Sequence, residues 1–191
     1  EEHKLFITEV VSNMRTGKLL AVPSGILLIG SQGTGKTVFA EAMAFEAGIP
    51  FVSLRNIREK WVGQSERNLD FAIELILAQE PVVVFVDEID QEFQLRSSIG
   101  DNTGVNQHIQ GRLFRFMADT DLRGKVLWIA ATNRPDLLDP ALLREGRFDY
   151  KIPFFPPNSS ERLKIIRALI LKNQMKAEQM GEALNVELTD E

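Results

Sequence analysis

Apolar and polar positions along the chain follow two patterns, one typical of buried strands and one typical of helices. Continuous runs of aliphatic residues, with charged or Gly-containing segments on either side, predict strands that are buried on both faces. These runs cover residues 25–29, 51–54, 82–86 and 126–131. The intervening segments have apolar residues at the three- and four-residue spacing of helices. We expect these helices over about residues 5–16, 36–47, 65–79 and 105–117, with another after residue 159.

Strands that alternate with helices form a mainly parallel sheet with helices on both faces, so the expected fold class is α/β with three layers. A chain of 191 residues accommodates one such domain and is too short for two. Pro153, Pro156 and Pro157 interrupt the pattern near the end. We therefore place the main α/β domain at residues 1–158 and the beginning of a smaller helical unit at residues 159–191.

Composition narrows the choice of partners and compartment. The chain has 22 Lys and Arg against 27 Asp and Glu, a net charge of −5, so it has no overall basic field and we expect no nucleic-acid partner. It has no cysteine, which excludes disulfides and thiolate metal sites and agrees with a cytoplasmic or other intracellular location. No apolar run approaches the roughly 20 residues of a membrane helix, and we expect no membrane segment or signal peptide in this chain.

The first chemical motif follows the strand at residues 25–29. Gly30-Ser31-Gln32-Gly33-Thr34-Gly35-Lys36-Thr37 fits the phosphate-binding pattern G-x-x-x-x-G-K-[ST]. Its glycines let successive N–H groups point at phosphate oxygens, and the following helix directs its positive end to the same place. Lys36 is expected to reach the β and γ phosphates, and the Thr37 hydroxyl to coordinate Mg²⁺. The alternative, a glycine-rich turn without a ligand, is disfavoured because a buried strand precedes the motif and a helix follows it.

The second motif is the pair of carboxylates, Asp87 and Glu88, directly after the apolar run 82–86. At the carboxyl end of a parallel sheet, Asp87 can hold magnesium and Glu88 can polarise an attacking water. The alternative is that these acids, together with Asp90 and Glu92, form only a solvated strand end. The phosphate loop upstream favours the catalytic interpretation, with ATP and Mg²⁺ as the ligands.

The sequence Val-Leu-Trp-Ile-Ala-Ala-Thr-Asn at residues 126–133, continued to Asp149, resembles the second region of homology of AAA ATPases. The resemblance extends over about residues 23–172, and implies a P-loop NTPase core with a helical lid. It also implies that the strand before Asn133 lies between the phosphate-loop strand and the Asp-Glu strand, so that Asn133 acts as a polar sensor of the γ-phosphate. The alternative is that Asn133 caps the turn made with Pro135, and both interpretations can hold together.

Arg144 and Arg147 match the paired arginines of the same region. Their spacing on a short helical turn would place them on one face. The resemblance implies that both are arginine fingers acting on the γ-phosphate bound by a neighbouring subunit, in a homo-oligomer that is a hexamer at full length. Local pairing with Glu145 or Asp149 is the alternative, and spacing alone favours it.

Trp61-Val62-Gly63 is similar to the first pore loop of AAA unfoldases and severing enzymes, in which Trp61 and Val62 would grip a protein substrate. Trp61 could instead pack into the domain core. Residues 96–104 correspond by position to a second pore loop without a matching pattern. The resemblance therefore implies ATP hydrolysis coupled to remodelling, unfolding or disassembly of proteins by a ring. Two alternatives stay open, a nucleic-acid-associated loader and a non-threading assembly switch.

The chain departs from the family pattern in the phosphate loop itself. Ser31 and Gln32 stand where many relatives have two prolines. Phosphate chemistry places no constraint on these positions, so the expectation of nucleotide binding is unchanged.

Overall fold

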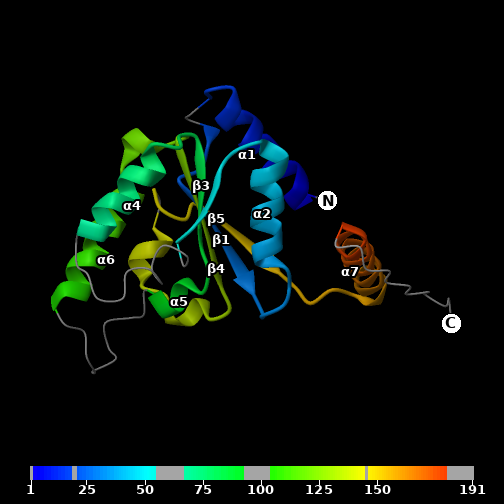
Figure 1. The fold of residues 1–191 in the computed structure, drawn as a ribbon. Helices are drawn as coiled ribbons and strands as arrows, with labels where there is room; N and C mark the ends of the chain where they lie inside the picture. Colours follow the sequence, from blue (N-terminus) through cyan, green and yellow to red (C-terminus); the bar gives the residue numbers. More distant parts are fainter. Residues whose placement is uncertain (1, 19–20, 55–66, 93–103, 145, 180–191) are drawn as a thin grey trace. The chain divides into compact units, whose positions relative to one another are not determined.

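The structure is a computed structural model that describes residues 2–18, 21–54, 67–92, 104–144 and 146–179. A five-stranded sheet runs through the main part of the chain, in the order β2-β3-β4-β1-β5, and all neighbouring strands are parallel (Figure 1). The strands are β1 (Gly25–Gly30), β2 (Phe51–Ser53), β3 (Val82–Val86), β4 (Val126–Thr132) and β5 (Tyr150–Phe154). The expected α/β class with a parallel sheet is confirmed.

Helices cover both faces of this sheet (Figure 1). They are α1 (Glu2–Arg15), α2 (Lys36–Ala47), α4 (Arg67–Leu77), α5 (Ile89–Glu92) and α6 (Gly104–Met117). A further helix, α7 (Ser159–Gln179), lies in the last part of the chain. Short 3-10 turns occupy Thr120–Leu122, Pro135–Leu137 and Pro140–Leu143. No helix among the residues described has the length and apolar character that crossing a membrane requires.

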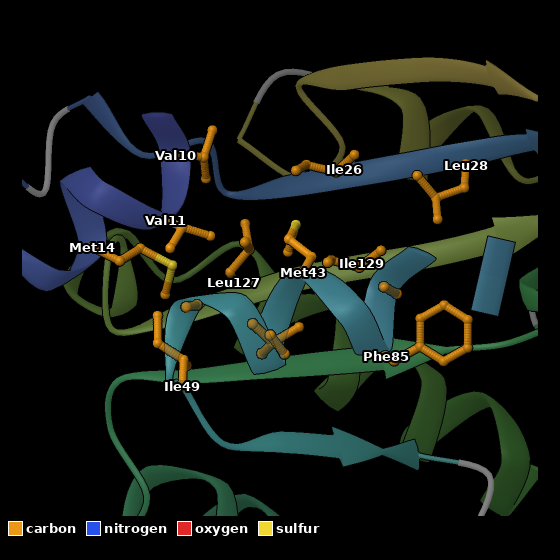
Figure 2. Packing of buried hydrophobic residues seen from close by; sticks show 14 of the residues in the cluster. Val10, Val11, Met14, Ile26, Leu28, Met43, Ile49, Phe85, Leu127 and Ile129 are labelled. Carbon is orange, nitrogen blue, oxygen red and sulfur yellow. The ribbon is translucent and has the colours of Figure 1, made fainter. Parts of the chain in front are cut away.

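Successive side chains along each strand point to opposite faces of the sheet, so the core consists of two layers, one on each face. On one face, Ile26 and Leu28 of β1 pack with Ile129 of β4 against helices α1 and α2, as Figure 2 shows. On the other face, Leu27 and Trp128 belong to the cluster that includes residues of α4, α5 and α6. Each central strand is thus buried on both sides, which explains its continuous apolar sequence.

The position of β4 between β3 and β1 agrees with the order implied by the AAA resemblance. Val84 pairs with Trp128, and Leu28 pairs with Ala131, so β4 is in register with a strand on each side. The carboxyl ends of the three strands therefore meet at one edge of the sheet. This edge carries the motifs singled out from the sequence.

Strand β5 was not predicted from the sequence. It pairs only with β1, at the edge of the sheet, and Ile152 is its one buried residue. Pro153 indicated a break in the chain, but an edge strand tolerates a proline because one side of its backbone needs no ladder hydrogen bond.

The chain divides into two compact units, Glu1–Phe154 and Phe155–Glu191. In the second unit, α7 begins with a capping box: Asn158 Oδ1 accepts a hydrogen bond of 2.9 Å from the Glu161 N–H, and Glu161 Oε2 accepts one of 2.8 Å from the Asn158 N–H. The functional division into a nucleotide-binding domain ending at residue 158 and a lid from residue 159 stays a prediction.

Candidate functional site

A cavity of about 370 Å³ lies where the ends of β1, β3 and β4 meet the beginning of α2. Its walls come from the phosphate loop, from the residues after β3 and from the end of β4. The lining residues are Gln32, Gly33, Gly35, Lys36, Thr37, Val38, Asp87, Glu88, Ala131, Thr132 and Asn133. The structure thus brings together most of the residues that the sequence assigned to ATP and magnesium.

The phosphate loop has the backbone conformation that its glycines were expected to permit. Gly33 and Gly35 have φ angles of +76° and +89°, in the left-handed region that L-residues with a Cβ rarely adopt. Gly35 is also the N-cap of α2, so the helix begins at Lys36 with its unpaired N–H groups and positive dipole end at the cavity. This arrangement suits a bound phosphate group.

Lys36 carries its ammonium group into this loop. Its Nζ donates hydrogen bonds of 2.8 Å to the carbonyl oxygens of Gly30 and Ser31, and the side chain as a whole is buried. The Thr34 hydroxyl also donates to the Ser31 carbonyl, at 2.8 Å. Within the part of the chain that the structure describes, this buried ammonium group contacts only neutral carbonyls and no carboxylate balances it, which favours an anionic ligand at this position.

Thr37 and Asp87 form the candidate magnesium site. The Thr37 Oγ1 lies 3.4 Å from Asp87 Oδ2, so a hydroxyl from α2 and a carboxylate from the end of β3 are adjacent at the cavity. Mg²⁺ prefers hard oxygen ligands and takes few of them from the protein when it binds together with a nucleotide. The residues present therefore fit a magnesium ion that accompanies ATP.

Glu88 is held in an unusual backbone conformation. Its φ of +48° is the one positive φ of a residue other than glycine among the residues described. Its N–H donates a hydrogen bond of 3.0 Å to Asp87 Oδ1, which supports the turn after β3. Left-handed backbone costs such a residue about 1–2 kcal/mol and is found disproportionately at functional sites.

Two side-chain amides contact the Glu88 carboxylate. Gln32 Nε2 donates to Oε1 at 3.1 Å, and Gln91 Nε2 donates to Oε2 at 2.9 Å. Gln91 was not predicted as a site residue from the sequence, and Gln32 was predicted only as part of the phosphate loop. Because Gln91 lies three residues after Glu88, the spacing of one helical turn was the available signal.

Asn133 follows β4 directly and lines the cavity, in the region expected for a sensor of the γ-phosphate. The alternative interpretation, in which Asn133 caps the turn with Pro135, is wrong. The N-cap of the turn Pro135–Leu137 is Arg134, which makes no side-chain capping hydrogen bond, and the Arg134 N–H instead donates to Thr132 Oγ1 at 3.0 Å. Asn133 is therefore not required to make the turn.

Asp90 is not part of a solvated strand end. It is 4% exposed, and its Oδ1 accepts a hydrogen bond of 2.6 Å from the Thr132 hydroxyl. This contact joins α5 to the end of β4, next to Asn133. This link could not be predicted from the sequence, because nothing in the pattern distinguishes the buried Asp90 from the partly buried Asp87 and Glu88.

Arg134 and Asp136 form an exposed pair beyond the end of β4, with hydrogen bonds of 2.9 and 3.1 Å. The hydrogen bond from Arg134 lowers the pKa of Asp136 below its ordinary value. The hydrogen bond to Asp136, and then its negative charge, raise the pKa of Arg134. The pair therefore stays ionised at neutral pH, and as an exposed pair it adds little to stability.

Arg144 and Arg147 do not lie on one helical turn, contrary to the expectation from their spacing. Arg144 is extended after the 3-10 turn Pro140–Leu143, with φ −77° and ψ 154°, and Gly146 has a φ of +83°. Arg144 is exposed, and among the described residues the structure shows no hydrogen bond or ion pair to it.

Arg147 instead contacts its own domain. Its Nη1 donates to the Ala141 carbonyl oxygen, and its Cζ lies 5.0 Å from the centre of the Phe114 ring. The expected local partner Asp149 is engaged elsewhere, because its carboxylate accepts from the N–H groups of Ser24 and Gly146, each at 2.8 Å. Glu145 lies outside the described residues.

The candidate pore loop also lies outside the part of the chain that the structure describes. This applies to Trp61, Val62 and Gly63, and to residues 96–103 of the second candidate loop. Their assignment to substrate contact stays a prediction.

Comparison with known proteins identifies the family. The family model described as "ATPase family associated with various cellular activities (AAA)" matches residues 26–156, more than half of the chain. The chain is 44% identical over 147 residues to Protein SAV of Sulfolobus acidocaldarius, covering 76% of this chain and 19% of that protein. It is 39% identical over 170 residues to the ATP-dependent zinc metalloprotease FtsH of Cutibacterium acnes, covering 87% and 23%.

A third relative is the Proteasome-activating nucleotidase of Methanococcus maripaludis, 36% identical over 169 residues, which cover 86% of this chain and 41% of that protein. The chain thus spans between about a fifth and two fifths of the length of these curated relatives. The matched residues include β1, the phosphate loop, β3, β4 and β5, which are the elements that build the cavity and the sheet around it. The chain therefore belongs to the AAA family and is an ATPase domain of that family, which uses ATP with Mg²⁺.

Proposed function

We propose that this domain couples ATP hydrolysis to the remodelling, unfolding or disassembly of protein substrates, as part of a ring-shaped homo-oligomer that is a hexamer at full length. The observation that carries the proposal is the meeting of Lys36, Thr37, Asp87 and Glu88 around one cavity. A phosphate loop, a pair of magnesium ligands and a carboxylate are the parts that phosphoryl transfer to water requires.

In this proposal the loop residues Gly30, Ser31, Gln32, Gly33, Thr34 and Gly35 surround the phosphates, and Lys36 neutralises their charge. Thr37 and Asp87 hold the magnesium ion, which supplies positive charge against the phosphate oxygens. Asn133, a neutral amide at the cavity, orients the attacking water without adding charge.

Glu88 acts as the general base. Its carboxylate accepts a proton from a water molecule while the water oxygen bonds to the terminal phosphorus of ATP. The bond from that phosphorus to the bridging oxygen breaks, and ADP leaves with the electron pair. The proton then passes from Glu88 to solvent, and phosphate and ADP are the products.

Protein substrates and oligomeric action are proposed from the relatives and from Arg144. One relative is named a proteasome-activating nucleotidase and another an ATP-dependent zinc metalloprotease, so both names associate a nucleotide with proteolysis. Arg144 is exposed without a partner among the described residues, as an arginine that completes a neighbouring subunit's site would be. Arg147 is proposed to contribute to the same interface. The negative net charge supports a protein substrate over a nucleic acid, and a cytoplasmic or other intracellular location is proposed.

Steady-state kinetics of the full-length protein tests the catalytic part. Glu88→Gln keeps the shape of the side chain but removes the base, so turnover should fall by about 10² to 10⁴ while MgATP binding persists. Lys36→Ala should abolish nucleotide binding in a titration with a fluorescent ATP analogue. Undiminished turnover in Glu88→Gln, or retained affinity in Lys36→Ala, would remove these residues from the proposed site.

Substitution of Trp61 separates a threading motor from an assembly switch. In a motor that pulls a polypeptide through its pore, Trp61→Ala should abolish unfolding of a tagged fluorescent protein and preserve basal ATP hydrolysis. Trp128→Phe, in the buried core, serves as a control for loss of an indole without loss of the loop residue. If Trp61→Ala retains full processing, the pore-loop role is wrong and the non-threading switch becomes the better interpretation.

A further inference from the structure

Both oxygens of the Glu88 carboxylate are engaged by amide groups from different parts of the chain. Gln32 donates to Oε1 from the phosphate loop, and Gln91 donates to Oε2 from α5. The distances of 3.1 and 2.9 Å are those of ordinary N–H···O hydrogen bonds. An ionised carboxylate can only accept hydrogen bonds, so each amide must present its NH₂ group to Glu88.

The backbone of Glu88 is also fixed. Its φ of +48° and the hydrogen bond from its N–H to Asp87 Oδ1 set the direction in which the side chain leaves the main chain. The side chain beyond Cα retains three rotatable bonds, and only its carboxylate contacts can select one orientation. Gln32 and Gln91 supply such contacts, one at each oxygen.

The two amides that contact Glu88 come from different segments of the chain, so the contacts are not confined to the turn that contains Glu88. Gln91 follows Glu88 by three residues and moves with the same segment. Gln32 precedes α2 and belongs to the loop around the proposed phosphate site, 56 positions away in sequence. The Gln32 contact therefore connects the proposed base to the loop that would hold the phosphates.

Gln32, which contacts Glu88, is not at a position that the phosphate-binding motif defines. It is one of the unspecified positions of G-x-x-x-x-G-K-[ST], so the motif itself does not require a glutamine there. The connection to Glu88 therefore depends on the amide side chain that this chain carries at residue 32. Phosphate chemistry places no constraint on the residue type at this position, so the side chain of Gln32 is available for a contact with Glu88.

We propose that Gln32 and Gln91 are positioning residues that hold the Glu88 carboxylate in the orientation for activating water, with Gln32 linking that orientation to the phosphate loop. The inference rests on the proposed role of Glu88. General bases act only within a narrow geometry, and a displacement of about 1 Å can cost about 10²-fold in rate.

Methionine substitutions remove the donors with little change of side-chain length. In the full-length protein, Gln32→Met and Gln91→Met should each lower kcat by about tenfold, which is within the range that general base catalysis contributes. KM for ATP and the Kd of MgATP should stay within about twofold, because the loop binds phosphate through its backbone N–H groups, which both substitutions keep. Gln79→Met, at an exposed glutamine beyond α4, is the matched control and should keep the wild-type kcat.

Both glutamines are exposed, so these substitutions leave the core unchanged. In a Glu88→Gln background, which already lacks the base, adding Gln32→Met should lower kcat by no more than about twofold further. A full tenfold additional loss there would mean that Gln32 acts on something other than Glu88, and would overturn the proposal.

Hydrogen exchange detected by mass spectrometry provides a readout that does not involve turnover. Without added nucleotide, Glu88→Ala and Gln32→Met should each speed amide exchange in the peptide that covers residues 28–38, because each breaks the same anchor of the loop. The double variant should exchange no faster than either single variant, and a peptide within β4 should be unaffected.

The outcomes separate this inference from the proposed function. An inactive wild-type protein would overturn the ATPase role itself. The positioning role is supported if the wild type is active and the glutamine variants lose kcat about tenfold with unchanged KM. It is supported further if Glu88→Ala and Gln32→Met speed amide exchange in the loop to the same extent, singly or together. Three results would each overturn the positioning role and leave ATP hydrolysis intact. They are a wild-type kcat in Gln32→Met and Gln91→Met, a rise in KM without a fall in kcat, and loop exchange that Glu88→Ala does not change.

Discussion

The Thr132 hydroxyl donates a hydrogen bond of 2.6 Å to the carboxylate of Asp90, and both side chains are buried. The same hydroxyl oxygen accepts a hydrogen bond of 3.0 Å from the Arg134 N–H, so Thr132 contacts both Asp90 and Arg134. The contact holds the end of β4 against α5 at the rim of the cavity, beside Asn133. It is therefore a connection between the carboxylate segment and the segment of the candidate sensor.

Thr132→Val should destabilise the fold by about 1–3 kcal/mol, because the replacement has the same shape but leaves the buried Asp90 oxygen without its donor. Thr132→Ser keeps the hydroxyl and should lose only about 1 kcal/mol with the methyl group. Urea denaturation of the two variants measures the difference. If valine is tolerated as well as serine, the hydrogen bond contributes nothing to stability.

Motifs with a fixed spacing and a buried strand before them could be predicted from the sequence. The run Gly25–Ile29 followed by the glycines of the loop predicted both β1 and the start of α2, because strand burial and loop chemistry require these residue types. The same holds for β3 and Asp87. In each case the local pattern and the tertiary environment favour the same structure.

Features that depend on tertiary contact could not be predicted in this way. Ile152 is the one buried residue of β5, so the strand lacks the continuous apolar pattern of the central strands. The helical turn expected for Arg144 and Arg147 is absent because Gly146 adopts a positive φ, and glycine is compatible with either conformation. Gln91 was identified only from the geometry, because its three-residue spacing from Glu88 does not by itself show that an exposed glutamine makes a contact.

Gly30 and Gly111 should respond in opposite directions to alanine. A Cβ at Gly30 would overlap the carbonyl oxygen of Phe154 on the neighbouring strand β5, whereas a Cβ at Gly111 would meet no other described atom within 4 Å outside the backbone of its own helix. Gly111 lies inside α6, where alanine is favoured by about 0.5–1 kcal/mol. Gly111→Ala should therefore raise the free energy of unfolding and Gly30→Ala should lower it, as thermal and urea unfolding can measure. Equal effects would contradict the close approach of β1 and β5.

Acid titration should reveal the Arg134–Asp136 pair. Because the hydrogen bond from Arg134 lowers the pKa of Asp136 in the folded protein, the pair stabilises the fold above the ordinary value of 3.8 and loses this contribution as the pH falls through the lowered pKa. Arg134→Met should return the pKa of Asp136 toward 3.8, as followed by the carboxyl carbon signal in NMR. Lys125→Met, which affects a cation near Glu80, is the control. An unchanged Asp136 midpoint in Arg134→Met would show that another group lowers it.

Arg144 and Arg147 should differ in what their loss costs. Arg147→Ala removes a hydrogen bond to Ala141 and a contact with the Phe114 ring, so it should lower stability by about 1–3 kcal/mol in addition to any effect on turnover. Arg144→Ala touches no described partner and should leave the unfolding midpoint unchanged. If Arg144 completes a neighbouring site, its loss should lower kcat by about 10³ or more in the full-length protein.

A mixing experiment tests whether Arg144 acts between subunits. The Arg144→Ala protein keeps its own Lys36, and the Lys36→Ala protein keeps its own Arg144, so each variant lacks what the other can supply across an interface. Two inactive preparations should therefore regain ATPase activity when combined, in proportion to the interfaces that join an intact Lys36 to an intact Arg144. Arg144→Ala mixed with itself at the same total concentration is the baseline. If the combination stays at that baseline while subunit exchange is demonstrated by fluorescence energy transfer, Arg144 serves its own subunit and the ring mechanism loses its main support.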